Sequence, residues 1–106
     1  MKLYARQGDV YIFQVQSEDE VNKPLQENEN IVLAEGEATG HKHVLVGDRV
    51  ESKILAHYDG QWWIDVQGGA VVTHQEHAPI TLPAGKYVVR IQREYDPVLY
   101  ARKVVD

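Results

Sequence analysis

Short segments rich in β-branched and aromatic residues, separated by glycine-containing turns, constrain this chain more than any other feature of its sequence. Their apolar residues follow the strand pattern, and no segment shows the apolar stripe of an amphipathic helix. Strands are expected over 10–15, 31–33, 43–46, 50–58, 61–66, 70–74, 86–93 and 98–104. The sequence therefore predicts an all-β fold of about eight strands.

The turns between these segments favour compact antiparallel connections. Asp59–Gly60 and Gly68–Gly69 are two-residue hairpin signals, because glycine accepts positive φ without a Cβ clash. Gly47–Asp48 and the Pro-x-Gly turn at 82–85 separate further strands. A chain of 106 residues is expected to form one domain, 1–106. The prediction is a small β-barrel or a jelly-roll-like sandwich, which buries a core and limits exposed sheet edges.

Charge and cysteine content exclude several classes of function. The net charge is −5, and this argues against binding to nucleic acid or to anionic membranes. Cysteine is absent, so disulfides, thiolate metal sites and cysteine nucleophiles are excluded. No apolar run approaches the length of a membrane helix and no signal-peptide pattern is present, so a cytoplasmic location is expected. Segment 17–30 carries five acids and is expected to be a solvated, mobile loop.

Histidine is the one residue type that suggests a chemical site. His41 and His43 form an H-x-H pair, and side chains two apart point to the same side of a strand. His74 and His77 are three apart, so they converge only if the chain leaves strand geometry, which Pro79 favours. His57 lies beside the Asp59–Gly60 turn and is expected at the surface.

Two interpretations of the clusters stand side by side. In one, His41, His43, His74 and His77, with Glu76 as an oxygen ligand or hydrogen-bonding partner, bind a divalent transition metal: Zn²⁺, Fe²⁺, Mn²⁺ or Ni²⁺. In the other, the imidazoles are satisfied side chains of a half-buried strand surface, without a metal.

The pattern Gly36-x-x-x-Gly40-His41-x-His43, followed by a histidine-containing strand and a Pro-x-Gly turn, resembles a small cupin. That resemblance implies a β-barrel or jelly roll with a metal held by the H-x-H pair and a later histidine, here His74 or His77. The glutamate that cupins place shortly after the H-x-H pair is missing, and Asp48 is the nearest acid.

The strings GEATGHxH (36–43) and HxEHAPIxLPxGxY (74–87), together with Arg6-Gln7-Gly8-Asp9-Val10, are also similar to a set of small bacterial and phage proteins. This second resemblance implies no activity.

No reaction is predicted, because nucleotide-binding loops are absent and neither serine has a nucleophile context. The adjacent Trp62 and Trp63 are expected to face opposite sides of a strand, one in the core and the other at the surface or an interface. An alternative function is therefore a non-enzymatic interaction module, either a homo-oligomer or part of a larger bacterial or phage complex. A third is a pH switch made of unmetallated histidines.

Overall fold

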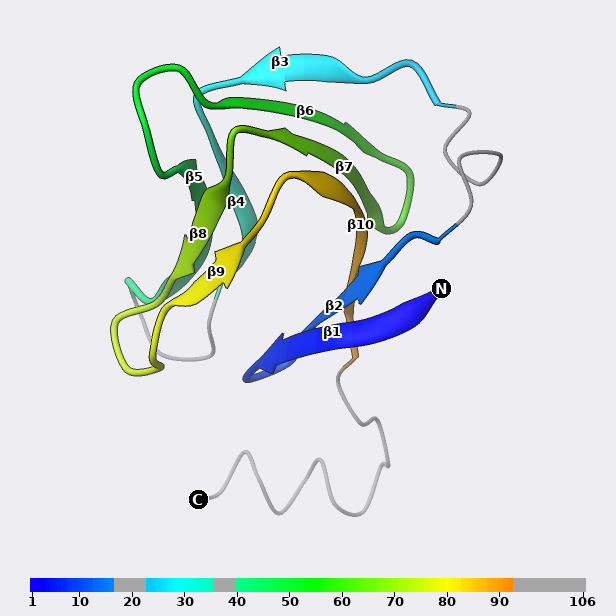
Figure 1. The fold of residues 1–106 in the computed structure, drawn as a ribbon. Helices are drawn as coiled ribbons and strands as arrows, with labels where there is room; N and C mark the ends of the chain where they lie inside the picture. The colour runs from blue at the N-terminus through cyan, green and yellow to red at the C-terminus, as the bar shows by residue number, and fades with distance from the viewer. Residues whose placement is uncertain (17–22, 36–39, 93–106) are drawn as a thin grey trace, which may run out of the picture.

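The computed structural model describes residues 1–16, 23–35 and 40–92, which form ten strands and no helix (Figure 1). The strands are β1 Lys2–Gln7, β2 Val10–Gln14, β3 Gln26–Asn28, β4 Asn30–Glu35, β5 Lys42–Gly47, β6 Lys53–Tyr58, β7 Trp62–Gln67, β8 Ala70–Thr73, β9 Ile80–Leu82 and β10 Gly85–Ile91. The all-β prediction is thus confirmed. No helix in the described ranges is long and apolar enough to span a bilayer.

The strands form two antiparallel sheets that pack face to face. The six-stranded sheet has the order β1-β2-β10-β7-β6-β3, and the four-stranded sheet has the order β4-β5-β8-β9. Each sheet keeps two edge strands, so the molecule is an open sandwich and not a closed barrel. Of the two predicted architectures, the sandwich is the one observed.

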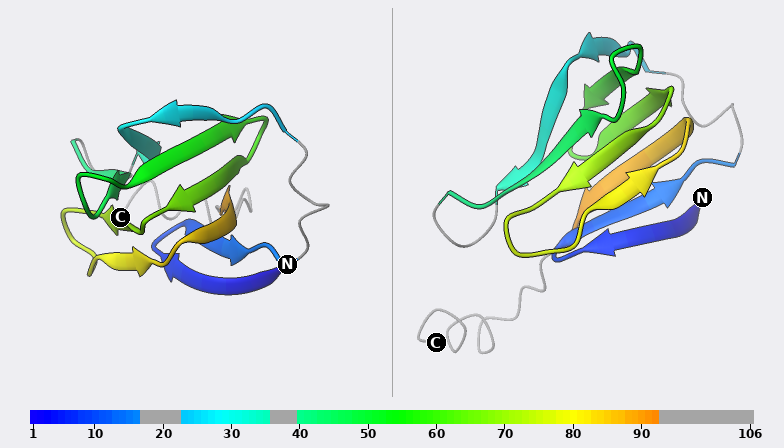
Figure 2. Two further views of the ribbon diagram at one scale, coloured as in Figure 1. Left: turned by 45° about the horizontal axis from the view of Figure 1, so that its top comes forward. Right: turned by 60° about the vertical axis from the view of Figure 1, so that its left-hand side comes forward.

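The chain passes repeatedly from one sheet to the other at short corners. Figures 1 and 2 show β9 of the four-stranded sheet running directly into β10 of the six-stranded sheet. The hairpin at Asp59–Gly60 is confirmed, because β6 and β7 pair with each other, but Tyr58 lies opposite Trp62, so the connection has three residues instead of the expected two. The hairpin at Gly68–Gly69 is wrong: β7 pairs with β6 and β10, whereas β8 pairs with β5 and β9. Gly68–Gly69 is a corner between the sheets.

The core lies between the sheets and takes alternate residues from most strands. Val10 and Ile12 of β2 and Ile64 and Val66 of β7 show this period of two. The core also includes Ile31, Leu33, Leu45, Ile54, Ala56, Ala70, Val72, Leu82, Tyr87 and Val89. Burial of each larger side chain contributes about 1.5–3 kcal/mol, and these contributions hold the two sheets together.

A pair of tyrosines joins the sheets between edge strands β1 and β9. The register of β1 against β2 shifts between Leu3 and Ala5, which places a bulge at Tyr4. The Tyr4 hydroxyl donates to the Thr81 carbonyl at 3.1 Å, and its ring meets the Tyr87 ring edge-on at 5.8 Å. Tyr87 is fully buried and donates to the Pro83 carbonyl at 2.6 Å. Burial raises the pKa of the Tyr87 hydroxyl, and the nearby Tyr4 adds to this.

The strand count differs from the expected eight because β1, β3 and β9 were not predicted. The expected strand at 98–104 lies outside the described residues. The acidic segment 17–30 was expected to be a loop, but Gln26–Asn28 pair with β6 as β3; residues 17–22 lie outside the described ranges.

The adjacent tryptophans face opposite ways, as predicted. Trp62 packs against the core and its indole N–H donates to the Leu33 carbonyl at 3.2 Å. The Trp63 indole N–H instead donates to Asp59.

Candidate functional site: a four-histidine cluster

The two histidine pairs meet at one end of the sandwich. His41 directly precedes β5 and His43 is its second residue, whereas His74 and His77 come from the β8–β9 loop. In Figures 1 and 2 this loop lies beside the β1–β2 turn. Ring centroids are 4.2 Å apart for His43–His74, 4.7 Å for His74–His77, 5.6 Å for His41–His74 and 6.1 Å for His43–His77. The expected convergence of four imidazoles is therefore observed.

Local structure explains how each pair reaches this point. Strand β8 ends at Thr73, so the chain leaves strand geometry before His74, as the spacing of three required. Antiparallel pairing of β5 with β8 sets Val44 opposite Thr73, and this register brings the start of β5 beside the β8–β9 loop. The Lys42 backbone N–H also donates to the Gln75 side-chain oxygen at 2.9 Å. That bond fixes the loop on β5.

Gln7 and His43 form a buried polar pair beneath the cluster. They are the two buried polar or charged side chains of the described residues, with exposed fractions of 2% and 4%. The Gln7 amide nitrogen donates to the Ala78 carbonyl at 2.9 Å and the Val72 carbonyl at 3.3 Å. Two carbonyl acceptors require the NH₂ group on that side, so the Gln7 oxygen, 2.8 Å from His43 Nδ1, accepts a hydrogen bond from it. The hydrogen of neutral His43 is thus on Nδ1, and Nε2 carries the lone pair.

His74 occupies the centre of the cluster, since its ring contacts those of His41, His43 and His77. Its Nδ1 accepts the backbone N–H of Glu76 at 3.1 Å. Burial lowers the pKa of His74, and the neighbouring His77 and His41 lower it further against an opposing effect of Glu76. Neutral imidazole, the form that binds metals, is therefore favoured at His74.

Glu76 lies at the solvent side of the cluster. Its carboxylate is 3.7 Å from His41 Nδ1, and its side chain is 68% exposed, compared with 24% for His41. The structure thus places Glu76 beside His41, as an outer partner of one ring.

Gly8, in the β1–β2 turn, allows the backbone to approach two of the rings. A Cβ atom at Gly8 would lie 3.1 Å from His77 Nε2 and 3.4 Å from His43 Cε1, and the residue has φ +58°. Both the contact and the positive φ favour glycine at this position. Gly8 and Gln7 therefore form the floor of the cluster.

The ring separations are near those of imidazoles on a shared metal ion, but the side chains are not placed to hold one. Two imidazoles bound to one tetrahedral ion, with metal–nitrogen distances of about 2.1 Å, have centroids about 5 Å apart. The observed separations of 4.2–6.1 Å lie around this value. In the part of the chain that the structure describes, no group of three or more histidine, aspartate or glutamate side chains has its ligand atoms arranged for coordination. Metal binding therefore requires side chains of the cluster to move. His74 in particular must turn, because its Nδ1 accepts a hydrogen bond from the Glu76 backbone N–H.

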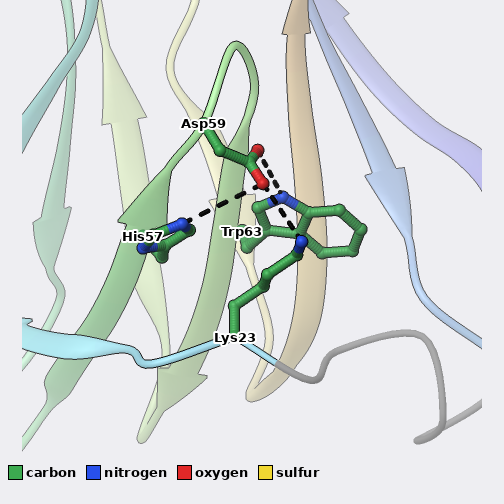
Figure 3. A network of polar contacts seen from close by, with 4 residues as sticks. All are labelled: Lys23, His57, Asp59 and Trp63. Atoms are coloured by element: carbon green, nitrogen blue, oxygen red, sulfur yellow. Dashed lines mark hydrogen bonds and ion pairs between the residues drawn. The ribbon is translucent and has the colours of Figure 1, made fainter.

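His57 takes no part in the cluster. Figure 3 shows it in a separate network with Lys23, Asp59 and Trp63 beside the β6–β7 hairpin. The Asp59 carboxylate is 3.9 Å from His57 and 3.3 Å from Lys23, and it accepts the Trp63 N–H at 2.8 Å. The Trp63 hydrogen bond, assisted by Lys23 and His57, lowers the pKa of Asp59 against a smaller effect of burial. His57 is partly exposed, in agreement with the surface position expected for it.

Sequence reasoning missed Gln7, Gly8 and Gln75 as members of the site. All three are remote from at least one histidine pair in sequence, and none has a residue type that signals a site by itself. A Gln-Gly pair just before the strand predicted over 10–15 was the available signal, but Lys2–Gln7 was not predicted as a strand.

One comparison with known proteins identifies a family. Residues 6–92 match the model of a domain of unknown function, DUF8820. The chain belongs to this family. The match includes both histidine pairs and the Gln7–Gly8 turn, so the cluster lies within the family's domain. No curated protein and no solved structure matches the chain.

Proposed function

We propose that the four-histidine cluster binds a divalent transition-metal ion. The observation that carries this proposal is the convergence of four imidazoles from two distant segments at separations near those of metal-bound rings. The rings of His43, His74 and His77 all lie within 4.2–6.1 Å of one another, and these three histidines serve as the ligands in the proposal. His41 and Glu76 then lie at the outer side of the ion, with Glu76 as the oxygen ligand or as the partner of His41.

The hydrogen bonding of His43 supports this function. Metal-binding histidines regularly donate their second ring N–H to a fixed acceptor, which sets the tautomer. His43 donates Nδ1–H to the Gln7 oxygen, so its lone pair is on Nε2, on the other side of the ring.

The ligand chemistry predicts an order of affinity. Neutral imidazoles suit Zn²⁺, Ni²⁺ and Fe²⁺, and affinity for a nitrogen site rises from Mn²⁺ through Fe²⁺ to Ni²⁺. We therefore expect Zn²⁺ and Ni²⁺ to bind more tightly than Fe²⁺ and Mn²⁺. A bound ion with open positions would act as a Lewis acid or would orient a small polar ligand.

Calorimetric titration of untagged, metal-free protein with Zn²⁺ and Ni²⁺ tests the proposal, and the expected result is one ion per chain. Co²⁺ provides an independent signal, because coordination by several nitrogens changes its visible absorption. Loss of an outer partner of a metal ligand costs about 10–100-fold in affinity, so loss of a ligand is expected to cost more. The variant His74→Asn/His77→Asn should therefore bind at least about 100-fold more weakly.

His57→Asn is the matched control, since it removes an imidazole outside the cluster and should leave affinity unchanged. Absence of one-to-one binding by the wild-type protein contradicts the proposal. Equal effects of His57→Asn and the double variant also contradict it, because binding would then be a surface property of histidines in general.

A second candidate function is self-association through sheet edges. Leu3 on β1 and Val32 on β4 are 50% and 42% exposed, and both strands are sheet edges. Exposed apolar residues on an edge favour pairing with another strand. Light scattering tests this candidate: a homo-oligomer that Leu3→Lys converts to a monomer supports it, and a monomer at all concentrations excludes it.

A further inference from the structure

The end of β1 supplies Gln7, a hydrogen-bond partner of His43 that the histidine pattern did not predict. Gln7 is the last residue of β1 and is fully enclosed, although glutamine is usually exposed. Its side chain crosses from the six-stranded sheet to the four-stranded sheet, where it meets Val72 and His43 and reaches Ala78 in the β8–β9 loop. It thus contacts both of the segments that supply the histidines.

The three Gln7 contacts also determine its orientation. Rotation of the amide by 180° would set its oxygen against two carbonyl oxygens and its NH₂ group against His43 Nδ1. Because the carbonyls cannot donate, the amide nitrogen must face them. The Gln7 oxygen is therefore held towards His43 by groups of the backbone, which do not titrate.

We infer that Gln7 is a positioning residue, which holds His43 in the Nδ1–H tautomer and so makes Nε2 its metal-binding nitrogen. This inference rests on the proposed metal-binding function. The Ala78 contact also ties the position of the β8–β9 loop, and with it His74 and His77, to the ring of His43. One side chain thus sets both the tautomer of one ligand and the placement of the loop that bears two others.

The first test uses the metal-free wild-type protein. Long-range ¹H–¹⁵N correlation spectra of ¹⁵N-histidine-labelled protein distinguish a protonated from an unprotonated ring nitrogen. We expect His43 to have Nδ1 protonated and Nε2 unprotonated at mildly alkaline pH. A protonated Nε2 overturns the inference, whether or not the protein binds a metal.

The second test compares Gln7→Met with Gln67→Met. Methionine has nearly the length of glutamine but neither its donors nor its acceptor, and Gln67 is an exposed glutamine of β7 whose side chain contacts Asp65, outside the cluster. Gln7→Met should lose the single His43 tautomer and weaken Zn²⁺ binding about 10–100-fold, whereas Gln67→Met should keep the tautomer and change binding by less than about twofold. Equal Zn²⁺ affinities for the two folded variants overturn the inference.

The two proposals fail in different ways. If the wild-type protein does not bind Zn²⁺ but has His43 as the Nδ1–H tautomer, the metal site is refuted. The conclusion that Gln7 sets the tautomer of His43 then still stands. A protein that binds Zn²⁺ with Nε2 of metal-free His43 protonated refutes the role of Gln7 alone. If Gln7→Met does not fold, the wild-type spectrum still decides.

Discussion

Gly69→Ala should destabilise the protein more than the same substitution at Gly60, although the two glycines have nearly the same backbone conformation. Gly69 has φ +101° and Gly60 has φ +97°. At Gly60 a Cβ atom would meet nothing within 4 Å. At Gly69 it would lie 2.7 Å and 3.0 Å from the two carboxylate oxygens of Asp48. The pair therefore separates backbone strain from steric conflict.

The backbone contribution is common to both substitutions. An alanine forced into this region of φ costs about 1–3 kcal/mol, and the loss of chain entropy in the unfolded state returns about 0.4–1 kcal/mol. We expect Gly60→Ala to lower the free energy of unfolding by about 1 kcal/mol. The value measured for Gly60→Ala gives the backbone contribution that is also expected at Gly69.

The steric contribution belongs to Gly69 alone. Asp48 must move, and its carboxylate accepts the Ser52 hydroxyl at 3.1 Å while its backbone N–H donates to the Gly69 carbonyl at 3.2 Å. Disturbance of these two hydrogen bonds costs about 1–2 kcal/mol more. Gly69→Ala should therefore lower the free energy of unfolding by about 2–3 kcal/mol.

Urea unfolding, followed by tryptophan fluorescence, gives both values. The double variant Asp48→Ala/Gly69→Ala should show a coupling of about 1 kcal/mol between the two sites, because removal of the carboxylate removes the conflict. Equal destabilisation by Gly60→Ala and Gly69→Ala would refute the reasoning, since the Asp48 contact would then have no energetic weight.

Three further predictions concern the tyrosine pair, the hairpin network and the cluster. Tyr87→Phe should lower the free energy of unfolding by about 1 kcal/mol, because a buried hydrogen bond is lost. Tyr4→Phe removes an exposed hydrogen bond and should lower it by less than about half of that. Equal losses of stability in urea unfolding would argue against a role for burial. Because the pKa of Asp59 is lowered on folding, its contribution to stability is complete above its unfolded pKa of 3.8 and is lost as the pH falls through the lower folded pKa. The melting temperature of Asp59→Asn should therefore fall less than that of the wild type between about pH 5 and about pH 2.5, and parallel curves would contradict this. Gly8→Ala should weaken Zn²⁺ binding about tenfold or more, because its Cβ would press on His77 and His43, while Gly60→Ala should leave the affinity measured by calorimetry unchanged.

The strand pattern predicted seven of the ten strands that the structure describes. In β2, β6 and β7 the buried Ile12, Ile54 and Ile64 alternate with less buried neighbours, because side chains two apart share a face of a strand. The edge strands β1, β3 and β9 escaped prediction, since Lys2–Gln7 and Gln26–Asn28 are largely exposed, and Gln26–Asn28 and Ile80–Leu82 have three residues each. Their pairing depends on a neighbouring strand rather than on their own residues.

The sequence predicted the four histidines of the cluster but not Gln7, the residue that supports them. The H-x-H spacing placed His41 and His43 on one side, and the interval between His74 and His77 required the irregular backbone that the loop provides. The sequence contained no sign that Gln7 lies beneath them, because a single glutamine has no spacing from which to infer a partner 36 residues away.

The sequence by itself determined that this chain forms strands, which residues share a face of each strand and which imidazoles are available, because these properties follow from local periodicity and residue chemistry. Only the tertiary structure decided which strands pair. Gly68–Gly69 permits either a hairpin or a corner by its conformation, and the corner forms because β7 pairs with β6 and β10 while β8 pairs with β5 and β9. That choice, made by burial of the whole core rather than by the turn, brings the two histidine pairs together above Gln7.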